Sequence, residues 1–300
     1  MSRKTSVLQI GGHAVEVSSL DKVLYPETGF TKGDVIQYYI HIAPVLLPHL
    51  RGRALTMKRY PDGVGKFFFY EKNCPAHRPK WLATASVYSK RKKEDTRYCV
   101  VDSLPGLVWA ANLADLELHV SLAQAKALQK PTAMVFDLDP GEGVNLLGCA
   151  RIALEIRKRL KADGLESFVK TSGSKGLQLY VPLNTAVNFD RTKEAARAMA
   201  DGLSADFPDE VTANMSKALR PGKVFIDWSQ NDDHKTTVCV YSLRATPKPG
   251  VSTPLEWREV TAALKAKKPA ALRFSPDQVL ARVKKKGDLF EPLLTLKQKL

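Results

Sequence analysis

The sequence feature that most constrains this chain is a short apolar run that leads into two aspartates. Residues 134–140 read Met-Val-Phe-Asp-Leu-Asp-Pro. An apolar run of this length, closed by a proline, predicts a buried strand. Because side chains on a strand alternate between its two faces, Asp137 and Asp139 are expected on one face and Leu138 on the other.

Two carboxylates on one face repel each other, and both stay ionised only if a cation lies between them. Hard divalent cations such as Mg²⁺ or Mn²⁺ are suited to oxygen ligands of this kind. The alternative is a strand end whose aspartates cap a turn, and an Asp-x-Asp motif alone does not separate the two interpretations.

A second stretch, residues 223–231, favours the metal interpretation. It also predicts a short apolar strand, and Asp227 lies within the apolar run. An ionised carboxylate in such a run needs a partner. Three carboxylates from two strands suit a pair of metal ions, which is the chemistry of phosphoryl or nucleotidyl transfer.

Charge and length suggest a nucleic-acid partner for one large domain or two small ones. The 300 residues carry a formal net charge of +15, and the pI is about 9.6. An excess of this size is typical of proteins that bind a polyanion, although a basic protein without such a partner stays open. An apolar content of 44% is enough for a packed core.

The cysteines and the hydropathy pattern predict a cytoplasmic protein. No two of the four cysteines have Cys-x-x-Cys spacing, so a zinc ribbon is not expected, and free thiols would fit a reducing cytosol. No apolar stretch is long enough to span a membrane, and the N-terminus lacks a signal peptide. The cysteines are Cys74, Cys99, Cys149 and Cys239.

The remaining pattern predicts an alternation of strands and helices. A hairpin is expected over 6–17, and Thr31 with Asp34 has the spacing of a capping box that begins a helix running to Leu47. Further strands are expected over 54–57, 66–70, 167–171, 177–183 and 238–243, and helices over 107–128, 146–161 and 190–206. Residues 247–254 have the composition of a linker, and a basic helical tail follows.

Several polar or aromatic segments carry a functional and a structural interpretation. Aromatic residues 67–70 could stack on bases or could belong to the core. Five of the nine residues 89–97 are basic and could contact phosphates or be simply solvated. The Gly-rich turn 172–176 could hold phosphate oxygens or be a tight hairpin turn, and its spacing is not that of a Walker A loop.

These segments together resemble the polymerase domain of bacterial DNA ligase D, a member of the archaeo-eukaryotic primase superfamily. The resemblance covers roughly residues 15–292. The motifs that carry it are Leu20–Glu27, Thr31–Asp34, Phe69–Lys72, Phe136–Pro140, Thr171–Leu177, Val224–Asn231, and Lys235–Thr237 with Tyr241–Ala245.

The resemblance implies an α+β, primase-like fold with two mixed or antiparallel β-sheets flanked by helices, one of them similar to an RNA-recognition module. It implies one catalytic domain over 1–300, with a possible 5′-phosphate-binding subregion in 1–130 and a linker and helical tail over 247–300. The implied activity is template-dependent addition of ribo- or deoxyribonucleotides at gaps and break ends in non-homologous end joining. The implied partners are Mn²⁺ or Mg²⁺ as two ions, DNA with a 5′-phosphate, the end-binding protein Ku and a ligase domain.

The resemblance also assigns roles position by position. Asp137, Asp139 and Asp227 match metal ligands, and His119 matches an active-site histidine. The positions that match nucleotide-binding residues are Phe69, Tyr70, Ser172, Lys175, Gln178, Gln230 and Arg244. Those expected at DNA or at its 5′-phosphate are Lys22, Lys32, Arg59, Lys90, Arg91, Lys92, Lys93 and Arg220. For Lys22 and Lys32 an ordinary solvated lysine is the alternative, and for His119 a structural histidine beside a carboxylate.

Gln178 departs from the family pattern, which usually has histidine at this position. Glutamine donates hydrogen bonds but carries no positive charge, so weaker triphosphate binding or an altered metal preference is expected. Tyr70 replaces a second phenylalanine, and either ring can stack. Two rival interpretations are a metal-dependent phosphatase or glycosyltransferase, which leaves the charge and the aromatic run unexplained, and a DNA-end bridging module with a weak or inactive site.

Overall fold

The computed structural model describes residues 5–89 and 93–300. The first of its two large sheets, called here the aspartate sheet, consists of β10 (Ala133–Pro140), β11 (Phe168–Thr171), β12 (Leu177–Pro182), β13 (Val211–Thr212), β14 (Val224–Asp227) and β18 (Pro254–Leu255). The second, called the histidine sheet, consists of β5 (Leu55–Arg59), β6 (Phe69–Glu71), β7 (Thr84–Ser89), β8 (Glu94–Cys99), β9 (Asp115–Val120) and β15 (Thr237–Val238). The strand orders are β13-β14-β10-β12-β11-β18 and β15-β9-β5-β8-β7, with β6 paired to β5.

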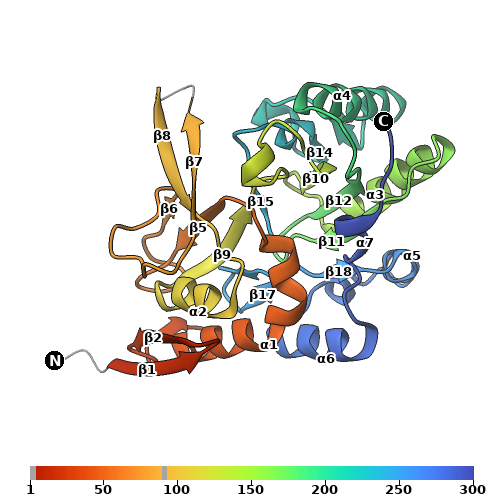
Figure 1. Cartoon of the computed structure of the whole chain (residues 1–300). Helices are drawn as coiled ribbons and strands as arrows, with labels where there is room; N and C mark the ends of the chain where they lie inside the picture. Colours follow the sequence, from red (N-terminus) through yellow and green to blue (C-terminus); the bar gives the residue numbers. More distant parts are fainter. Residues whose placement is uncertain (1–4, 90–92) are drawn as a thin grey trace.

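Helices and three short ladders surround these sheets (Figure 1). The ladders are β1 (Thr5–Ile10) with β2 (His13–Ser18), β3 (Val23–Tyr25) with β4 (Phe30–Thr31), and β16 (Leu243–Arg244) with β17 (Gly250–Val251). The helices are α1 (Lys32–Leu50), α2 (Leu104–Asn112), α3 (Leu146–Ala162), α4 (Phe189–Asp206), α5 (Trp257–Lys265), α6 (Pro276–Lys286) and α7 (Pro292–Thr295). None of the helices within 5–89 and 93–300 has the length and apolarity needed to cross a bilayer.

Strand β10 separates two hydrophobic cores. Met134, Phe136 and Leu138 belong to the core that contains α3 and α4. Val135, on the other face, belongs to the core formed by α1, α2 and the histidine sheet. Because the face alternates at each residue, Asp137 and Asp139 continue the Val135 face and lie on the side of the histidine sheet. The predicted orientation of the two aspartates is therefore confirmed.

The capping signals predicted from sequence are confirmed. Thr31 Oγ1 accepts from the backbone N–H of Asp34 at 3.2 Å, and the Asp34 carboxylate accepts from the Thr31 N–H at 2.8 Å. Loss of such a cap costs about 1 kcal/mol. The helix α1 then extends three residues beyond the expected Leu47. The hairpin over 6–17 is also present, as β1 and β2.

The expected helix over 107–128 is confirmed only as far as Asn112. Helix α2 ends at Asn112, and Ala114 has a left-handed φ of 58°, which breaks the helix. Strand β9 follows and carries Glu117 and His119 within the histidine sheet. The run of small and apolar residues has helical character, but pairing with β5 decides the structure of its second half.

Three shorter expectations also need correction. Of the aromatic run, only Phe69 and Tyr70 lie in a strand. The expected strand over 238–243 is interrupted by Tyr241, which has a φ of 65°. Residues 247–254 are not a linker, since β17 and β18 lie there and Ser252 and Thr253 are buried. Pro254 pairs with Lys170 at the edge of the aspartate sheet, a position that proline tolerates.

The prediction of four free cysteines is wrong for two of them. Cys74 and Cys99 form a disulfide across a sequence separation of 25 residues, while Cys149 and Cys239 are free and buried. The sequence does not predict this pairing, because the pairing depends on the loop after β6 returning to β8. At that point the Cys74 N–H donates to the carbonyl of Arg97 at 2.5 Å. The disulfide anchors the base of the β7–β8 hairpin, which projects from the molecule in Figure 1.

Candidate active site

The three predicted aspartates come together on adjacent strands. In the antiparallel ladders of β10, Asp137 lies directly opposite Asp227 of β14 and opposite Gln178 of β12. Directly opposed side chains in a sheet have Cβ atoms about 5 Å apart. Asp139 lies on the same face two residues further along and is exposed. The register therefore gathers three carboxylates at the end of one strand.

The electrostatics of this cluster fit a missing cation. Burial raises the pKa of Asp137 to about 7, and the charges of Asp139 and Asp227 add to the effect. The pKa of Asp139 is also raised, by burial and by Asp227. A divalent ion bound to oxygen ligands would remove this repulsion, so the donor set fits Mg²⁺ or Mn²⁺.

Asp227 is held by its own chain. Its Oδ1 accepts from the backbone N–H of Ser229 at 3.0 Å and from the Ser229 hydroxyl at 2.6 Å. Its Oδ2 accepts from Gln230 Nε2 at 3.0 Å. Gln230 Oε1 is buried with no hydrogen-bond partner. Gln230 thus contacts a predicted metal ligand directly, and its free carbonyl oxygen is available to a bound group.

The Gly-rich turn packs tightly against the strand of the aspartates. A Cβ on Gly176 would lie 2.1 Å from the carbonyl oxygen of Leu138, so only glycine fits there. The Ser172 hydroxyl accepts from the backbone N–H groups of Ser174 and Gly176 at 3.3 and 3.2 Å. The Ser172 side chain therefore shapes the turn, whereas Lys175 is exposed.

The opposite wall of the site is organised around Glu117 of β9, which is 2% exposed. Its carboxylate lies 3.1 Å from His119 Nε2, 3.4 Å from Lys58 Nζ and 3.2 Å from Arg244 Nε. Tyr60 donates to it at 3.3 Å. Burial would raise the pKa of Glu117, but the hydrogen bond from His119 and the charges of Arg244 and Lys58 lower it well below the usual value.

Arg244 connects the two walls. Its Nη1 donates to the backbone carbonyl of Ser172 at 2.6 Å, while its Nε faces Glu117. His119 lies in the same cluster, and burial lowers its pKa, so it is neutral near pH 7. Arg244 and His119 are thus joined through Glu117, a carboxylate that the sequence marked only as a neighbour of His119.

The aromatic segment lies over the same wall. Lys58 Nζ is 4.7 Å from the centroid of the Phe68 ring and 5.5 Å from that of Tyr70. The Tyr70 ring meets His119 edge-on at 5.8 Å and is 55% exposed. Phe69 packs on Arg59, with 5.2 Å between the guanidinium carbon and the ring centroid. Tyr70 is therefore the ring of this pair that is open to a ligand.

The predicted DNA-contacting residues differ in how accessible they are. Lys22 is exposed and pairs with Asp62 at 2.9 Å. Lys32 is only 6% exposed, and its Nζ donates to the carbonyl of Asn112 at 3.2 Å. Their backbones are joined, since the Lys32 N–H donates to the Lys22 carbonyl at 2.8 Å.

The other predicted DNA contacts are scattered around the site. Arg59 pairs with Glu71 at 2.6 Å. The guanidinium carbon of Arg220 lies 3.7 Å from the Phe225 ring centroid, and its charge lowers the pKa of Asp139. Lys93 is exposed at the tip of the β7–β8 hairpin, whereas Lys90, Arg91 and Lys92 lie outside the described residues.

A second acidic cluster lies in the loop after β14. Ligand atoms of Asp232, Asp233 and His234 all lie within 4.8 Å of one another, so this group could hold a metal ion. Lys193 forms an ion pair with Asp232, and Gln129 donates to Asp233 at 2.8 Å. These contacts already compensate the two carboxylates, unlike those of the aspartate sheet.

The comparisons with known proteins agree with this geometry. Residues 31–290 match the model of the family described as "LigD, primase-polymerase domain". The chain belongs to the LigD primase-polymerase family. It is 42% identical over 289 residues to the multifunctional non-homologous end joining DNA repair protein LigD of Mycobacterium tuberculosis, covering 93% of this chain and 37% of that protein.

Two further similarities define its extent and its fold. The bifunctional non-homologous end joining protein LigD of Bacillus subtilis is 34% identical over 274 residues, 91% of this chain and 43% of that protein. The chain thus spans less than half the length of these relatives. The solved polymerase domain of M. tuberculosis ligase D in complex with DNA aligns at a TM-score of 0.86 and 40% identity, covering 94% of this chain and 98% of that one. The expected α+β, archaeo-eukaryotic primase-like fold is confirmed.

Proposed function

We propose that residues 1–300 form one catalytic domain that adds ribo- or deoxyribonucleotides to a primer 3′-hydroxyl, directed by a DNA template, at gaps and double-strand break ends. The observation that carries the proposal is the cross-strand pair of Asp137 and Asp227 with Asp139 on the same face.

Asp137, Asp139 and Asp227 would hold two divalent ions, Mn²⁺ or Mg²⁺. When bound, such ions supply activation of an attacking hydroxyl and neutralisation of a leaving pyrophosphate. The chain's own contribution is to hold the carboxylates in register and to keep the strand ends rigid through Gly176 and Ser229. Rigid placement matters because it avoids reorganisation during the reaction.

The remaining site residues would bind and orient the nucleotide. Arg244 is held by Glu117 and by the Ser172 carbonyl, so its charge is fixed near the Gly-rich turn 172–176, which contains Lys175. Lys175 is exposed and can reach phosphate oxygens. Tyr70 offers an open ring face for base stacking, and neutral His119, whose Nε2 donates to Glu117, can accept a hydrogen bond at Nδ1 beside it.

The basic surface would bind DNA. Lys22 and Lys32 would recognise a downstream 5′-phosphate, with Lys22 making the direct contact because Lys32 is mostly buried. Arg220 and the 90–93 segment would contact the template or a second DNA end. Ku and a ligase domain are the partners expected from the family, and with them the reaction would belong to end joining. A catalytically weak end-bridging module of the same fold is the competing function, and only Gln178 favours it.

The test is extension of a gapped duplex that carries either a 5′-phosphate or a 5′-hydroxyl downstream. Ribo- and deoxyribonucleotides are compared with Mn²⁺ and Mg²⁺, and Asp137→Asn is run beside Asp232→Asn. We expect templated addition that is stimulated by the 5′-phosphate, lost in Asp137→Asn and retained in Asp232→Asn. DNA binding without addition under either metal would support the bridging function instead.

A further inference from the structure

Lys170 of β11 is a buried lysine for which the sequence indicates no role. It is 1% exposed. An ammonium group in such a place is costly unless it is well bonded. Its Nζ donates to Gln178 Oε1 and to Ser252 Oγ, both at 2.6 Å. Among the residues that the structure describes, no carboxylate forms a direct ion pair with it.

The register places Lys170 in one row with the predicted metal ligands. Lys170 lies opposite Gln178, Gln178 lies opposite Asp137, and Asp137 lies opposite Asp227. Residues that oppose each other directly in antiparallel strands project from the same face, and neighbouring side chains in such a row are in contact distance. One line of four side chains therefore runs across β11, β12, β10 and β14.

The hydrogen bond from Lys170 fixes which way the Gln178 amide points. Because Oε1 accepts from Lys170, the Nε2 end is directed to the other side of the amide. Gln178 lies directly opposite Asp137 in the ladder of β12 and β10, so the Nε2 end of the amide is left for the carboxylate side of the row. A lysine, an amide and a carboxylate thus lie in one row, with the amide between the other two.

We propose that Lys170 is a positioning residue that acts through Gln178 to orient the Asp137 carboxylate for metal binding. The inference deepens the proposed polymerase function and rests on it. Lys170 does not touch the metal, the nucleotide or the DNA. This role of Lys170 also explains how glutamine can occupy position 178. The Gln178 amide accepts a hydrogen bond from the Lys170 amino group and so links that group to Asp137.

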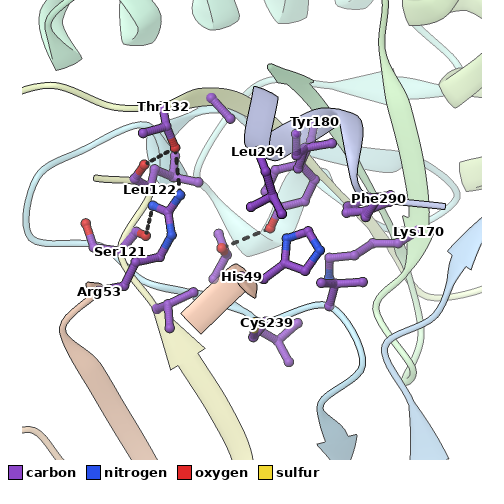
Figure 2. A pocket seen from close by; sticks show the side chains of 16 residues that line it. His49, Arg53, Ser121, Leu122, Thr132, Lys170, Tyr180, Cys239, Phe290 and Leu294 are labelled. Atoms are coloured by element: carbon purple, nitrogen blue, oxygen red, sulfur yellow. Dashed lines mark hydrogen bonds between the residues drawn. The ribbon is translucent and has the colours of Figure 1, made fainter. Parts of the chain in front are cut away.

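The far side of Lys170 borders a cavity between the two sheets. Figure 2 shows Lys170 beside His49 and Phe290 at the wall of this space, which has a volume of about 50 Å³ and is partly open to solvent. The ammonium also lies 5.6 Å from the Tyr180 ring centroid. The space gives room for a longer arginine side chain, so Lys170→Arg is a suitable conservative variant.

The experiment measures Mn²⁺ binding to the free protein by the decrease of the electron paramagnetic resonance signal of free Mn²⁺. The variants are Lys170→Met, Lys170→Arg, Gln178→Met and the double Met variant. Residues that orient metal ligands typically change affinity by about 10- to 100-fold when removed. We expect Lys170→Met to weaken Mn²⁺ binding by at least about 10-fold and Lys170→Arg to restore most of it.

The sign of the effect separates positioning from simple charge. Removing a nearby positive charge would by itself tighten the binding of a cation, so weaker binding requires a positional role. Lys248→Met, which removes an exposed lysine paired with Glu27, is the matched control for loss of charge. Circular dichroism establishes that each variant is folded, and Gln178→Met interrupts the row without removing the lysine.

If Lys170 acts through Gln178, the double variant binds Mn²⁺ about as weakly as Gln178→Met alone. Unchanged or tighter binding in folded Lys170→Met overturns the inference, as does full additivity with Gln178→Met. The readout does not depend on catalysis. Wild-type protein that binds Mn²⁺ but extends no primer would refute the polymerase function while these comparisons still decide the role of Lys170.

Discussion

The two walls of the site contain opposite charge arrangements. On the aspartate sheet, Asp137, Asp139 and Asp227 share a face and form no direct ion pair with any residue that the structure describes, and burial and repulsion raise the pKa of the first two. On the histidine sheet, Glu117 is surrounded by cations, and its pKa is lowered. The charges of the three aspartates are balanced only when a ligand binds, so we call this side of the site the uncompensated wall. The charge of Glu117 is balanced by side chains of the chain itself, so we call that side the compensated wall. The difference indicates that the aspartates bind a ligand, whereas Glu117 stabilises the structure around the site.

The largest effect on activity is expected when one of the three aspartates of the uncompensated wall is replaced. Asp227→Asn should reduce primer extension by at least about 10³-fold, because metal binding contributes several kcal/mol to the transition state. DNA binding, measured by fluorescence anisotropy, should change little, since it depends on the basic surface. The matched control is Asp233→Asn in the second acidic cluster, and equal losses in the two variants would contradict the assignment of the metal site.

Replacing Glu117 in the compensated wall should instead lower the stability of the folded protein. Glu117→Gln leaves Lys58 and Arg244 without their carboxylate in a buried place, which we expect to lower the free energy of unfolding by about 3 kcal/mol. Urea unfolding monitored by circular dichroism measures this. The control is Glu71→Gln, which removes a more accessible carboxylate with one partner, Arg59, and should cost less than about 1 kcal/mol. A Glu117→Gln protein as stable as this control would be inconsistent with a supporting role.

The pH dependence of stability should have opposite signs for the two walls. The folded-state pKa of Asp137 is raised to about 7, so its contribution destabilises the metal-free protein as pH rises from about 4 towards 7. Asp137→Asn should therefore match the wild type at pH 4 and be more stable by about 4 kcal/mol at pH 8. Mn²⁺ should reduce that difference, because it stabilises the wild-type carboxylate.

Glu117 provides the opposite case. Its lowered pKa stabilises the fold above the unfolded-state value of 4.5, and that stability is lost as pH falls below it. The cost of Glu117→Gln should be full at pH 8 and smaller at pH 3. Thermal unfolding of both variants at each pH checks the two slopes. The same slope for both would show that the two walls do not differ in their charge balance.

Sequence reasoning succeeded where local pattern determines structure. The period of two in β10 placed Asp137 and Asp139 on one face, and the capping box of Thr31 and Asp34 set the start of α1. It failed where distant strands decide. The strand that carries Glu117 was taken for helix because its pairing with β5 is not encoded locally, and the Cys74–Cys99 disulfide depends on a loop that returns to β8.

Lys170 illustrates the remaining limit for the site. A single lysine before Thr171 in a predicted strand gives no sign that it lies in register with Gln178 and, through it, with Asp137. Register across three strands is a property of the sheet and not of any one segment. A lysine beside Phe168 and Val169 in a predicted strand was the available signal, since a lysine that is buried needs a partner.

The smallest effect on stability is expected at Tyr70, an exposed ring at the edge of the compensated wall. Tyr70 is 55% exposed and meets His119 only by its edge, so Tyr70→Ala should leave the free energy of unfolding within about 0.5 kcal/mol of the wild type. If its ring stacks on a base, nucleotide binding should weaken by about 1 kcal/mol, roughly a fivefold rise in KM. Tyr70→Phe keeps the ring and should bind nucleotide as the wild type does. Tyr88→Ala, at a comparably exposed ring on β7, controls for loss of an exposed aromatic side chain. An unchanged KM in Tyr70→Ala would indicate that the Tyr70 ring packs only against Lys58 and its neighbours. Tyr70 would then make no direct contact with the nucleotide.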